Sequence, residues 1–400
     1  MPGIERNPMA KYWVIEGPVD RMTETGPFLK PRQMLTYSLG ADCAWPLECA
    51  ANRAVSHPPS RSTGPPMHRY QVLVPDYLTD VELEKSLLGD IADITPLALS
   101  RDEEFVPHAH KADALLLYHD IGIGQAAIAK MDRCRGIVRC GVGFNNVDLA
   151  AAGERGILVC NVPDYGTEDV ADHAIMMLLA LPRKLVENHN VIVSGGWEPA
   201  LIFGAPRMRG RTLGIIGCGR IGTATALRAK PMGLDILYYD PFARPGTDKA
   251  LGLTQTHSLD ELLAKSDFVT LHCPLTAKTH HILNAKTLAK MKPTAYLVNT
   301  ARGPCVDNEA LVEALDQNHL AGAALDVTDP EPPVSVRLRT HPKILLTPHV
   351  AYYSDKGFLE MRTKGADEAR RLLLGEPVRN LVNRAYLKEP RSALPELLAE

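Results

Sequence analysis

From Met67 onward, short apolar or β-branched runs alternate with longer stretches in which apolar residues recur at helical spacing. Ten runs have the length and composition of strands: YQVLV, ALLLY, GIVRC, ILVC, LGIIG, DILYY, FVTLH, AYLVN, GAALD and KILLT. Strands that alternate with helices are typical of parallel sheets covered by helices. The pattern therefore predicts an α/β protein with two doubly wound parallel-sheet domains.

Two long helical patterns interrupt this alternation of short strands and helices. The first begins after Gly166, with Thr167 as its expected N-cap and an apolar face in VADHAIMMLLAL, and Pro182 should bend or break it. The second, SDKGFLEMRTKGADEARRLLLG, follows the last strand. We predict a first domain in two parts, residues 67–166 and 347–385, a second domain inserted at 167–346, and a tail at 386–400.

Residues 1–66 differ from the rest of the chain. Ten of the 31 prolines fall there, and the segment ends in HPPSRSTGPP, which cannot hold a helix or a central strand. We interpret it as a disordered extension and linker. The alternative is that translation starts at Met67.

Composition narrows the function classes. The 400 residues exceed what one core usually fills, and a net charge of -3 gives no basic excess for binding nucleic acid directly. The eight cysteines form neither a C-x-x-C pair nor a metal-binding cluster with histidine, so we predict reduced thiols in a cytoplasmic protein without a metal site. The longest apolar run, AIMMLLAL, is too short to span a membrane.

Three glycines in LGIIGCGRIG carry the first functional signal. Gly217, Gly219 and Gly222 form G-x-G-x-x-G between a strand and a helix. The first glycine allows a tight turn, the second lets a diphosphate approach the main chain, and the third lets the helix pack closely on its strand. Unpaired backbone amides at the start of the following helix then point at the diphosphate. Close helix packing without any ligand is the alternative explanation.

The following strand, LDILYYD, strengthens the first explanation. It ends at Asp240, 18 residues after the third glycine, where a carboxylate can accept hydrogen bonds from the adenosine ribose hydroxyls. A carboxylate there repels a 2′-phosphate, and Arg244 alone does not clearly reverse that effect. The sequence thus predicts a Rossmann-type domain that binds NAD rather than NADP.

Further candidates follow later strands. Arg302 lies in LVNTARG, Asp326 and Glu331 lie in AALDVTDPEP, and His349 lies in LLTPHVAYYS. Ligands of α/β domains bind at the carboxyl ends of strands, so these side chains should meet beside the cofactor. Each residue alone is unremarkable, and their shared position carries the prediction.

These segments resemble the D-isomer-specific 2-hydroxyacid dehydrogenase family, with its LHCPLT, NTARG, D-V-x-x-x-E-P and TPH signatures, over about Tyr70 to Asn383. Within the family, ALLLYH, VRCGVGFNNVD, LGIIGCGRIG, YLVNTARG and AYYS most resemble the C-terminal-binding protein branch. The resemblance implies that the NAD domain is inserted in a flavodoxin-like substrate domain. It also implies a homodimer joined through the cofactor domains.

The resemblance implies a mechanism as well. Arg302 holds the carboxylate and carbonyl oxygens of the substrate, a task that suits the fixed fork of a guanidinium. His349 donates a proton to the carbonyl oxygen as the hydride arrives, and becomes the base in the reverse direction. Glu331 bonds the other imidazole nitrogen, which orients the ring and favours its protonated form.

The remaining site residues are carried over in the same way. The substrate is expected to contact Tyr118, Arg139, Val142, Gly143 and Tyr352, with His119 nearby; ordinary aromatic packing is the alternative for the two tyrosines. The cofactor is expected to contact Val170, Ile216, Gly217, Cys218, Gly219, Arg220, Ile221, Gly222, Asp240, Cys273, Pro274, Thr279, Thr300, Ala301 and Asp326. Nothing near Cys273 indicates an activated thiolate, so it receives no nucleophilic role.

Departures from the family pattern concern substrate choice. Asn145 replaces an Asp, Tyr352 replaces the Trp of the similar branch, and Pro304 and Cys305 follow the NTARG signature where a Gly and an aliphatic residue are common. The leading hypothesis is an NAD-dependent oxidoreductase acting on a small 2-oxo or 2-hydroxy acid. The alternative is an NADH-responsive corepressor or scaffold. Formate oxidation is disfavoured by Glu331, because formate dehydrogenases of the superfamily have Gln there.

Overall fold

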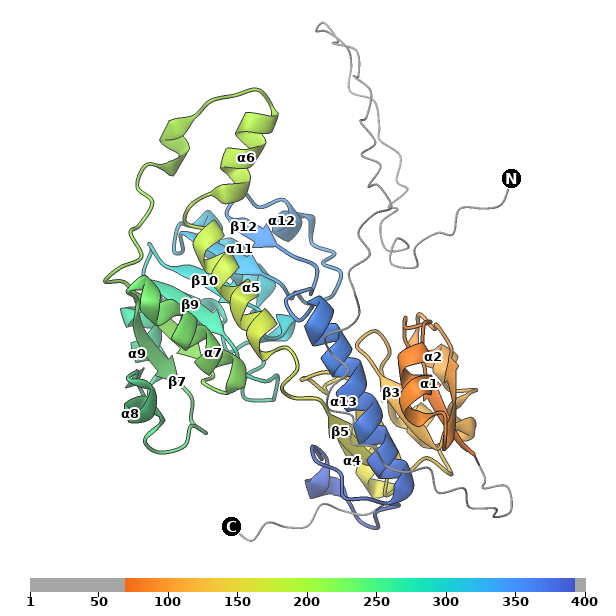
Figure 1. Cartoon of the computed structure of the whole chain (residues 1–400). Coiled ribbons are helices and arrows are strands. Elements are labelled where there is room, and N and C mark those ends of the chain that lie inside the picture. Colours follow the sequence, from red (N-terminus) through yellow and green to blue (C-terminus); the bar gives the residue numbers. More distant parts are fainter. Residues whose placement is uncertain (1–68, 393–400) are drawn as a thin grey trace, which may run out of the picture. The chain divides into compact units, whose positions relative to one another are not determined.

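The computed structural model describes residues 69–392. The chain divides between Pro65 and Pro66 into two units, and every described element belongs to the second unit (Figure 1). The extension predicted over residues 1–66, and the end of the tail predicted over 386–400, lie outside the described residues.

The first sheet has five parallel strands in the order β2-β1-β3-β4-β5. This is the flavodoxin-like order, as predicted for the substrate domain. Its strands are β1 (Tyr70–Val74), β2 (Ala92–Pro96), β3 (Ala114–Leu117), β4 (Gly136–Arg139) and β5 (Leu158–Asn161). Its helices are α1 (Glu82–Leu88), α2 (Asp102–Phe105), η2 (Ala109–Lys111), α3 (Gln125–Ile128), α4 (Leu149–Glu154), α13 (Asp355–Leu374) and η6 (Arg384–Tyr386).

The second sheet has seven parallel strands in the order β12-β11-β10-β9-β6-β7-β8. This is the Rossmann order with one additional edge strand, which confirms the predicted fold class. Its strands are β6 (Thr212–Ile216), β7 (Asp235–Tyr239), β8 (Thr254–Gln255), β9 (Phe268–Leu271), β10 (Tyr296–Asn299), β11 (Gly322–Leu325) and β12 (Ile344–Leu346). Its helical segments are α5 (Thr167–Ala180), α7 (Arg220–Ala229), η4 (Lys230–Met232), α8 (Thr247–Leu251), α9 (Leu259–Lys265), α10 (Ala285–Leu288), η5 (Gly303–Cys305), α11 (Asn308–Asp316) and α12 (Val336–Arg339).

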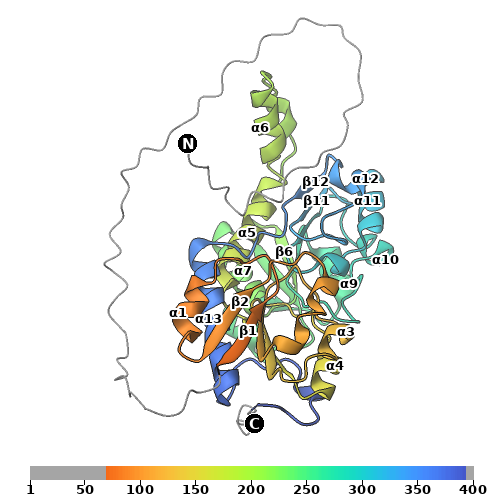
Figure 2. The same cartoon turned by 90° about the vertical axis from the view of Figure 1, so that its right-hand side faces the viewer.

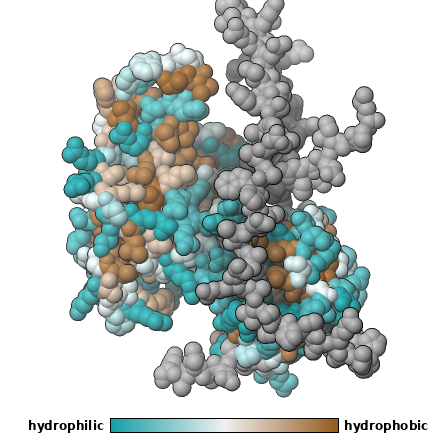
Figure 3. Space-filling view, viewed as in Figure 1, coloured by the Kyte–Doolittle hydropathy of each residue, from teal (hydrophilic) through white to brown (hydrophobic). Residues whose placement is uncertain are grey.

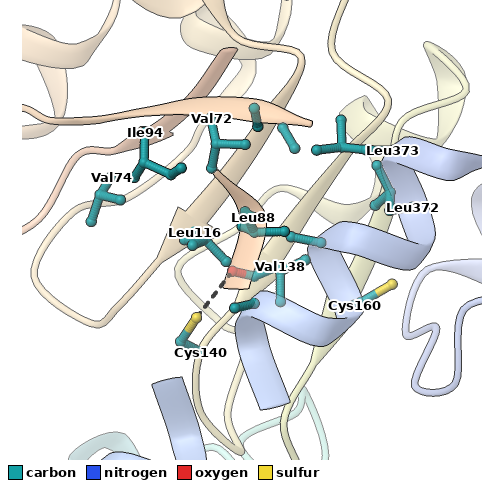
Figure 4. Packing of buried hydrophobic residues seen from close by; sticks show 14 of the residues in the cluster. Val72, Val74, Leu88, Ile94, Leu116, Val138, Cys140, Cys160, Leu372 and Leu373 are labelled. Carbon is teal, nitrogen blue, oxygen red and sulfur yellow. Dashed lines mark hydrogen bonds between the residues drawn. The ribbon is translucent and has the colours of Figure 1, made fainter. Parts of the chain in front are cut away.

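The chain enters the second sheet through α5 and returns to the first after β12. Helix α13 packs against β3 and β4, and the segment after it forms an isolated bridge between Leu381 and Cys160. Figure 4 shows Leu372 and Leu373 of α13 in the same apolar cluster as Val72 and Val138 from the strands. The returning helix therefore completes the core of the first domain, and the residue limits of the domains stay our prediction.

One local prediction is wrong, one is confirmed, and two strands were not predicted. The helix α5 begins at Thr167 itself, so Gly166 is its N-cap, and the Thr167 hydroxyl donates to the Asp164 carbonyl at 2.9 Å. The break expected at Pro182 is confirmed, since α5 ends at Ala180. Strands β2 and β8 were not among the ten predicted runs.

A buried ion pair joins α1 to α13. The guanidinium of Arg362 donates to both carboxylate oxygens of Glu84, at 2.8 and 2.6 Å, and the Glu84 side chain is wholly inaccessible to solvent. On the same face of α13, Arg370 makes a similar fork with Asp90 at the surface, where the side chains are 34% and 60% exposed. Removing one partner from the buried pair leaves a desolvated charge, whereas the surface pair contributes little.

We expect Arg362→Met to lower the free energy of unfolding by about 3–5 kcal/mol, because Glu84 is left unpaired in the core. The matched change Arg370→Met should cost about 1 kcal/mol or less. Urea unfolding followed by circular dichroism measures both. Equal losses in the two variants would contradict the importance assigned to the buried pair.

Residues 183–208, which we call the arm, leave the second domain between α5 and β6 and extend away from both sheets (Figures 1 and 2). The arm contains α6 (Leu185–Val193) and η3 (Pro199–Ile202), and neither has a buried residue. Its exposed apolar side chains are Leu185, Val186, Ile192, Val193, Trp197 and Phe203. Brown side chains are visible over this region in Figure 3. Among residues 69–392, no helix combines the length and apolarity needed to cross a membrane.

Candidate functional site

Side chains from both sheets line one pocket at the carboxyl ends of their strands. From the first domain come the end of β4 and the turn after it; from the second come the start of α5 and the ends of β10 and β11. The segment after β12, where the chain returns to the first domain, also lines the pocket. The lining residues are His119, Arg139, Cys140, Val142, Tyr165, Gly166, Val170, Ile221, Thr300, Arg302, Asp326, His349, Ala351, Tyr352 and Met361.

His349 and Glu331 form the pair that the sequence predicts. The Nδ1 atom of His349 lies 2.7 Å from a carboxylate oxygen of Glu331. Burial alone raises the pKa of Glu331, but the hydrogen bond and charge of His349, together with the Thr328 amide, bring that pKa below its usual value. With Nδ1 engaged, Nε2 is the nitrogen left for chemistry in the pocket.

The backbone around His349 is held by Asp326. The main-chain amide of His349 donates to the Asp326 carbonyl at 2.7 Å, and His349 has a φ of 52°. The buried Asp326 carboxylate accepts from the Thr347 hydroxyl at 2.5 Å and from the amides of Val350 and Ala351 at 3.0 Å. The resemblance implied a cofactor contact for Asp326; the structure in addition makes it the anchor of the histidine loop.

Arg302 reaches across the pocket to the first domain. Its Nη1 donates to the Ala301 carbonyl at 2.6 Å, and its Nε donates to Oδ1 of Asn145 at 3.0 Å. Its Nη2 lies against Gly143, where an added Cβ would come within 1.6 Å of it. Burial, followed by the charge of Arg139, lowers the pKa of Arg302.

Arg139 is a second guanidinium in the same pocket. The residue is only 8% exposed; its Nη1 donates to the Cys140 carbonyl at 3.2 Å, and its Nε is buried with no hydrogen-bond partner. An added Cβ on Gly141 would lie 1.5 Å from Nη1. Within the described part of the chain, the amides of Val142 and Gly143 donate to no protein acceptor. The turn thus presents two free donors between two arginines.

Tyr118 does not line the pocket, contrary to expectation. It is 1% exposed and packs in the core of the first domain, with its hydroxyl 3.5 Å from Glu84. The side chain points inward because the buried Asp76 carboxylate binds the Tyr118 amide at 2.6 Å and the amides of Asp120 and Ile121 at 2.9 Å. Packing, the alternative explanation, holds for this tyrosine.

His119, next along the chain, does face the pocket. Its ring centroid lies 5.7 Å from those of His349 and Tyr352. Burial lowers the pKa of His119 to about 4, and the neighbouring His349 contributes in the same direction. Neutral His119 and Tyr352 therefore form an uncharged wall beside the His349 imidazole.

The glycine motif has the geometry that a dinucleotide requires. Gly217 has a φ of 92°, and a Cβ there would lie 2.7 Å from the Cys273 amide nitrogen. A Cβ on Gly222 would lie 2.1 Å from the Gly217 carbonyl oxygen, which shows how closely helix and strand pack. A Cβ on Gly219 would meet nothing within 4 Å, so this position is open for a diphosphate.

Other predicted cofactor residues surround that loop. The amides of Arg220 and Ile221 at the start of α7 donate to no described protein group. Asp240 accepts from the Cys218 amide at 2.9 Å and from the Phe242 amide at 2.8 Å, which fixes its carboxylate beside the loop. Ile216 is 1% exposed in the core, so only its backbone can reach a ligand.

On the nicotinamide side, the residues also fit. Val170 and Thr300 line the pocket, and the buried Thr300 hydroxyl has no hydrogen-bond partner. Ala301 is 8% exposed next to Arg302. The loop after β9, which the resemblance places on the adenosine and ribose side instead, is closed by the Thr279 hydroxyl, which donates to the Pro274 carbonyl at 2.6 Å.

The cysteines of this region behave differently from one another. The adjacent Cys305 thiol and burial raise the pKa of Cys273, in keeping with the absence of a nucleophilic role. The Cys273 thiol and the charge of Arg302 lower the pKa of Cys305. The six cysteines in the described part are free thiols, and no cluster of metal-ligating side chains occurs among residues 69–392.

Sequence reasoning missed Asp76 and Tyr165. Tyr165 lines the pocket, and Asp76 fixes the loop that carries His119. A signal existed for Asp76, because it follows β1 at the carboxyl end where polar residues gather. Nothing local distinguishes Tyr165 from a packing residue.

This combination of a Rossmann sheet, a glycine loop and a His–Glu pair beside an arginine defines the class of nicotinamide-dependent α/β proteins. Residues 175–351 match the family model described as D-isomer specific 2-hydroxyacid dehydrogenase, NAD binding domain. The solved D-lactate dehydrogenase of Aquifex aeolicus, in complex with NAD and lactic acid, is 30% identical with a TM-score of 0.68, covering 76% of this chain and 96% of that chain. The chain belongs to the D-isomer-specific 2-hydroxyacid dehydrogenase family, and its cofactor is NAD.

Two curated relatives are also similar. The chain is 36% identical over 313 residues to D-3-phosphoglycerate dehydrogenase of Synechocystis sp., covering 78% of this chain and 56% of that protein. It is 35% identical over 344 residues to C-terminal-binding protein 1 of Caenorhabditis elegans, covering 84% of this chain and 47% of that protein. The likeness to C-terminal-binding proteins is thereby confirmed. The chain spans about half the length of these curated relatives.

We expect Asp240→Ala to raise the dissociation constant for NAD about 10- to 100-fold, because hydrogen bonds to a charged acceptor are lost. The affinity for NADP should fall less, since the carboxylate no longer repels a 2′-phosphate. Fluorescence titration with NADH and NADPH measures both, and Asp235→Ala, an exposed change at the start of the same strand, is the control. A wild-type preference for NADPH would refute the role given to Asp240.

Proposed function

We propose that the protein is an NAD-dependent oxidoreductase that interconverts a small 2-oxo acid and its D-2-hydroxy acid. The observation that carries this proposal is the convergence of the His349–Glu331 pair and Arg302 on one pocket beside the glycine loop. The residues proposed for the cofactor and substrate are those of the sequence analysis, with Tyr118 withdrawn. Its free thiols are in keeping with a cytoplasmic location, which is also our proposal.

The chain's own groups account for the proton and charge steps. NADH held by the glycine loop, Asp240 and Thr300 would supply the hydride for the carbonyl carbon of the substrate. His349 donates the proton on Nε2 to the carbonyl oxygen, while Glu331 holds Nδ1 and compensates the imidazolium charge. Arg302 and the free amides of Val142 and Gly143 bind the carboxylate and fix the face that is attacked. In the reverse direction His349 accepts the proton.

The alternative function is an NADH-responsive scaffold, which the likeness to C-terminal-binding protein 1 favours. In that case the cofactor would change partner affinity, and turnover would be incidental. The intact arrangement of Arg302, Glu331 and His349 supports catalysis more strongly, because a scaffold needs no aligned proton donor.

We expect purified protein with NADH to reduce at least one of glyoxylate, pyruvate, hydroxypyruvate or a longer 2-oxo acid. His349→Asn should lower kcat/KM by about 10² to 10⁴, the usual contribution of a positioned proton donor. Asn tolerates the positive φ at this position, so the fold is retained. The exposed change Glu309→Gln serves as the control.

Three results test the two hypotheses. Tight NADH binding with no turnover of any 2-oxo acid would favour the scaffold. Turnover that survives His349→Asn undiminished would refute the proposed proton donor. Loss of turnover with unchanged NADH binding supports the enzyme.

We also propose that the protein is a homodimer in which the arm contacts the second copy. Trp197 and Phe203 are 79% and 77% exposed, and no described element covers them. Exposed apolar side chains gathered on one projecting segment are typical of an interface. The arm emerges from the cofactor domain, in keeping with the dimer that the resemblance implies.

We expect Trp197→Ser combined with Phe203→Ser to convert the dimer to a monomer, because the apolar contact area of the arm is lost. Light scattering coupled to gel filtration measures the mass. The control Phe242→Ser removes an equally exposed aromatic outside the arm. A wild-type mass of one chain would overturn the dimer itself.

A further inference from the structure

Two thiols of the second domain lie next to each other between the loop after β9 and the loop of Arg302, and the proposed proton and charge steps use neither. We propose that Cys273 and Cys305 are a modification site, at which a hydroperoxide oxidises the pair to a reversible disulfide. The modification itself is independent of the proposed function. Its effect on turnover rests on that function, because the effect is transmitted through Arg302.

The fold brings the two cysteines together from separate segments. Cys273 follows β9 and Cys305 follows β10, and these strands pair in parallel with Leu271 opposite Asn299. The Cys305 carbonyl accepts from the Leu283 amide at 3.1 Å, which holds η5 against the segment after the Cys273 loop. Both side chains belong to one apolar cluster, and each thiol changes the pKa of the other. Neighbouring thiols on two loops are what a disulfide requires.

The two thiols differ in reactivity. The Cys273 thiol, the positive charge of Arg302 and a hydrogen bond from the Arg302 backbone lower the pKa of Cys305, against the opposing effect of burial. The thiolate is the form of cysteine that attacks a peroxide, so Cys305 is the first nucleophile of the pair. The pKa of Cys273 is raised, chiefly by the neighbouring Cys305 and by burial. Cys273 therefore remains protonated while Cys305 reacts.

The oxidation takes two steps. The Cys305 thiolate attacks one oxygen of the hydroperoxide and the O–O bond breaks, which gives a sulfenic acid and an alcohol, or water when the oxidant is hydrogen peroxide. The negative charge beside Cys273 is then gone, so this thiol can release its proton. Its sulfur attacks the sulfenic sulfur, the S–S bond forms, and the hydroxyl group leaves with that proton as water. The two thiols lose two electrons, which the peroxide gains.

The position of the pair selects a small oxidant. Cys273 is only 8% exposed and Cys305 is fully buried, but the loop above them is at the surface at Pro274 and residues 276–278. Loops at ligand sites open locally at a low cost in free energy, and hydrogen peroxide is uncharged and little larger than water. Burial excludes a large oxidant such as glutathione disulfide. The site is therefore specific for a small hydroperoxide.

A disulfide changes the position of two functional loops. It brings the sulfur atoms to about 2.05 Å, so the loops must move from the positions they have around two free thiols. The Cys273 backbone packs against Gly217, and the Cys305 amide donates to the Arg302 carbonyl at 3.1 Å. The movement therefore reaches both the glycine loop and the guanidinium. A misplacement of about 1 Å can lower a rate about 10²-fold, so the oxidised protein is the less active form.

The chemical test needs no turnover. Full-length protein with Cys43→Ser and Cys49→Ser, which removes the two cysteines outside the described residues, is treated with hydrogen peroxide, alkylated and digested. We expect mass spectrometry to find a peptide in which Cys273 is linked to Cys305, and to lose it after dithiothreitol. Peroxide treatment that leaves both thiols alkylated, or that oxidises Cys305 without forming the link, would overturn the inference.

The functional test follows kcat/KM with NADH and a 2-oxo acid before and after peroxide. We expect a fall of about 10- to 100-fold, restored by dithiothreitol. Cys305→Val keeps an apolar side chain in the core and should retain the basal activity without the sensitivity to peroxide. The control Cys134→Ala removes another buried thiol, whose pKa burial raises to about 12, and should leave the sensitivity intact. Unfolding midpoints, with Cys305→Ala as a second variant, show whether a loss is structural.

The outcomes distinguish this inference from the proposed function. If no 2-oxo acid is turned over, the proposed function fails, and the linked peptide still decides the modification site. If turnover is efficient and no linked peptide forms, the inference fails and the dehydrogenase stands. A disulfide that changes neither kcat/KM nor the dissociation constant for NADH would overturn the effect on the site. Undiminished sensitivity of Cys305→Val to peroxide would overturn the assignment to this pair.

Discussion

The site depends on the buried Asp326 carboxylate more than on any other group. It receives hydrogen bonds from Thr347, Val350 and Ala351, and the carbonyl of the same residue receives the His349 amide. A carboxylate taken out of water is stable only when its lone pairs are satisfied, and here one short loop satisfies them. The carboxylate and the loop therefore fix each other, and the imidazole acquires its position from that mutual constraint.

The same constraint explains why residues distant in sequence meet. Glu331 follows β11, Arg302 follows β10 and His349 follows β12, which are neighbouring strands of one parallel sheet. Their carboxyl ends share an edge, so three unrelated segments deliver side chains to one place. The hydrogen bonds between this loop and Asp326 hold His349 at its positive φ of 52°.

Much of the fold was predictable from the sequence because buried parallel strands are continuous apolar runs. The two strands that were missed lie at sheet edges: β2 alternates buried and exposed residues and ends at Pro96, and β8 has only two residues. The pairing of His349 with Glu331 was predictable only through the resemblance to the family, whose signatures contain both residues. The inward orientation of Tyr118 was not, because it depends on Asp76 and Glu84, whose contacts form only when β1, α1 and the loop after β3 come together. The acceptor role of Asn145 toward Arg302 spans 157 positions and has no local signal.

The two domains supply different groups to the site. Glu331 and Arg302 extend from the second domain, whereas Arg139 and the amide turn belong to the first. His349 lies where the chain returns to the first domain, but its amide is bound to Asp326 of the second. A hinge motion at the two chain crossings would leave the reacting groups assembled and change only their spacing from the groups that recognise the acid. Opening and closing can then admit or release a molecule without dismantling the chemistry.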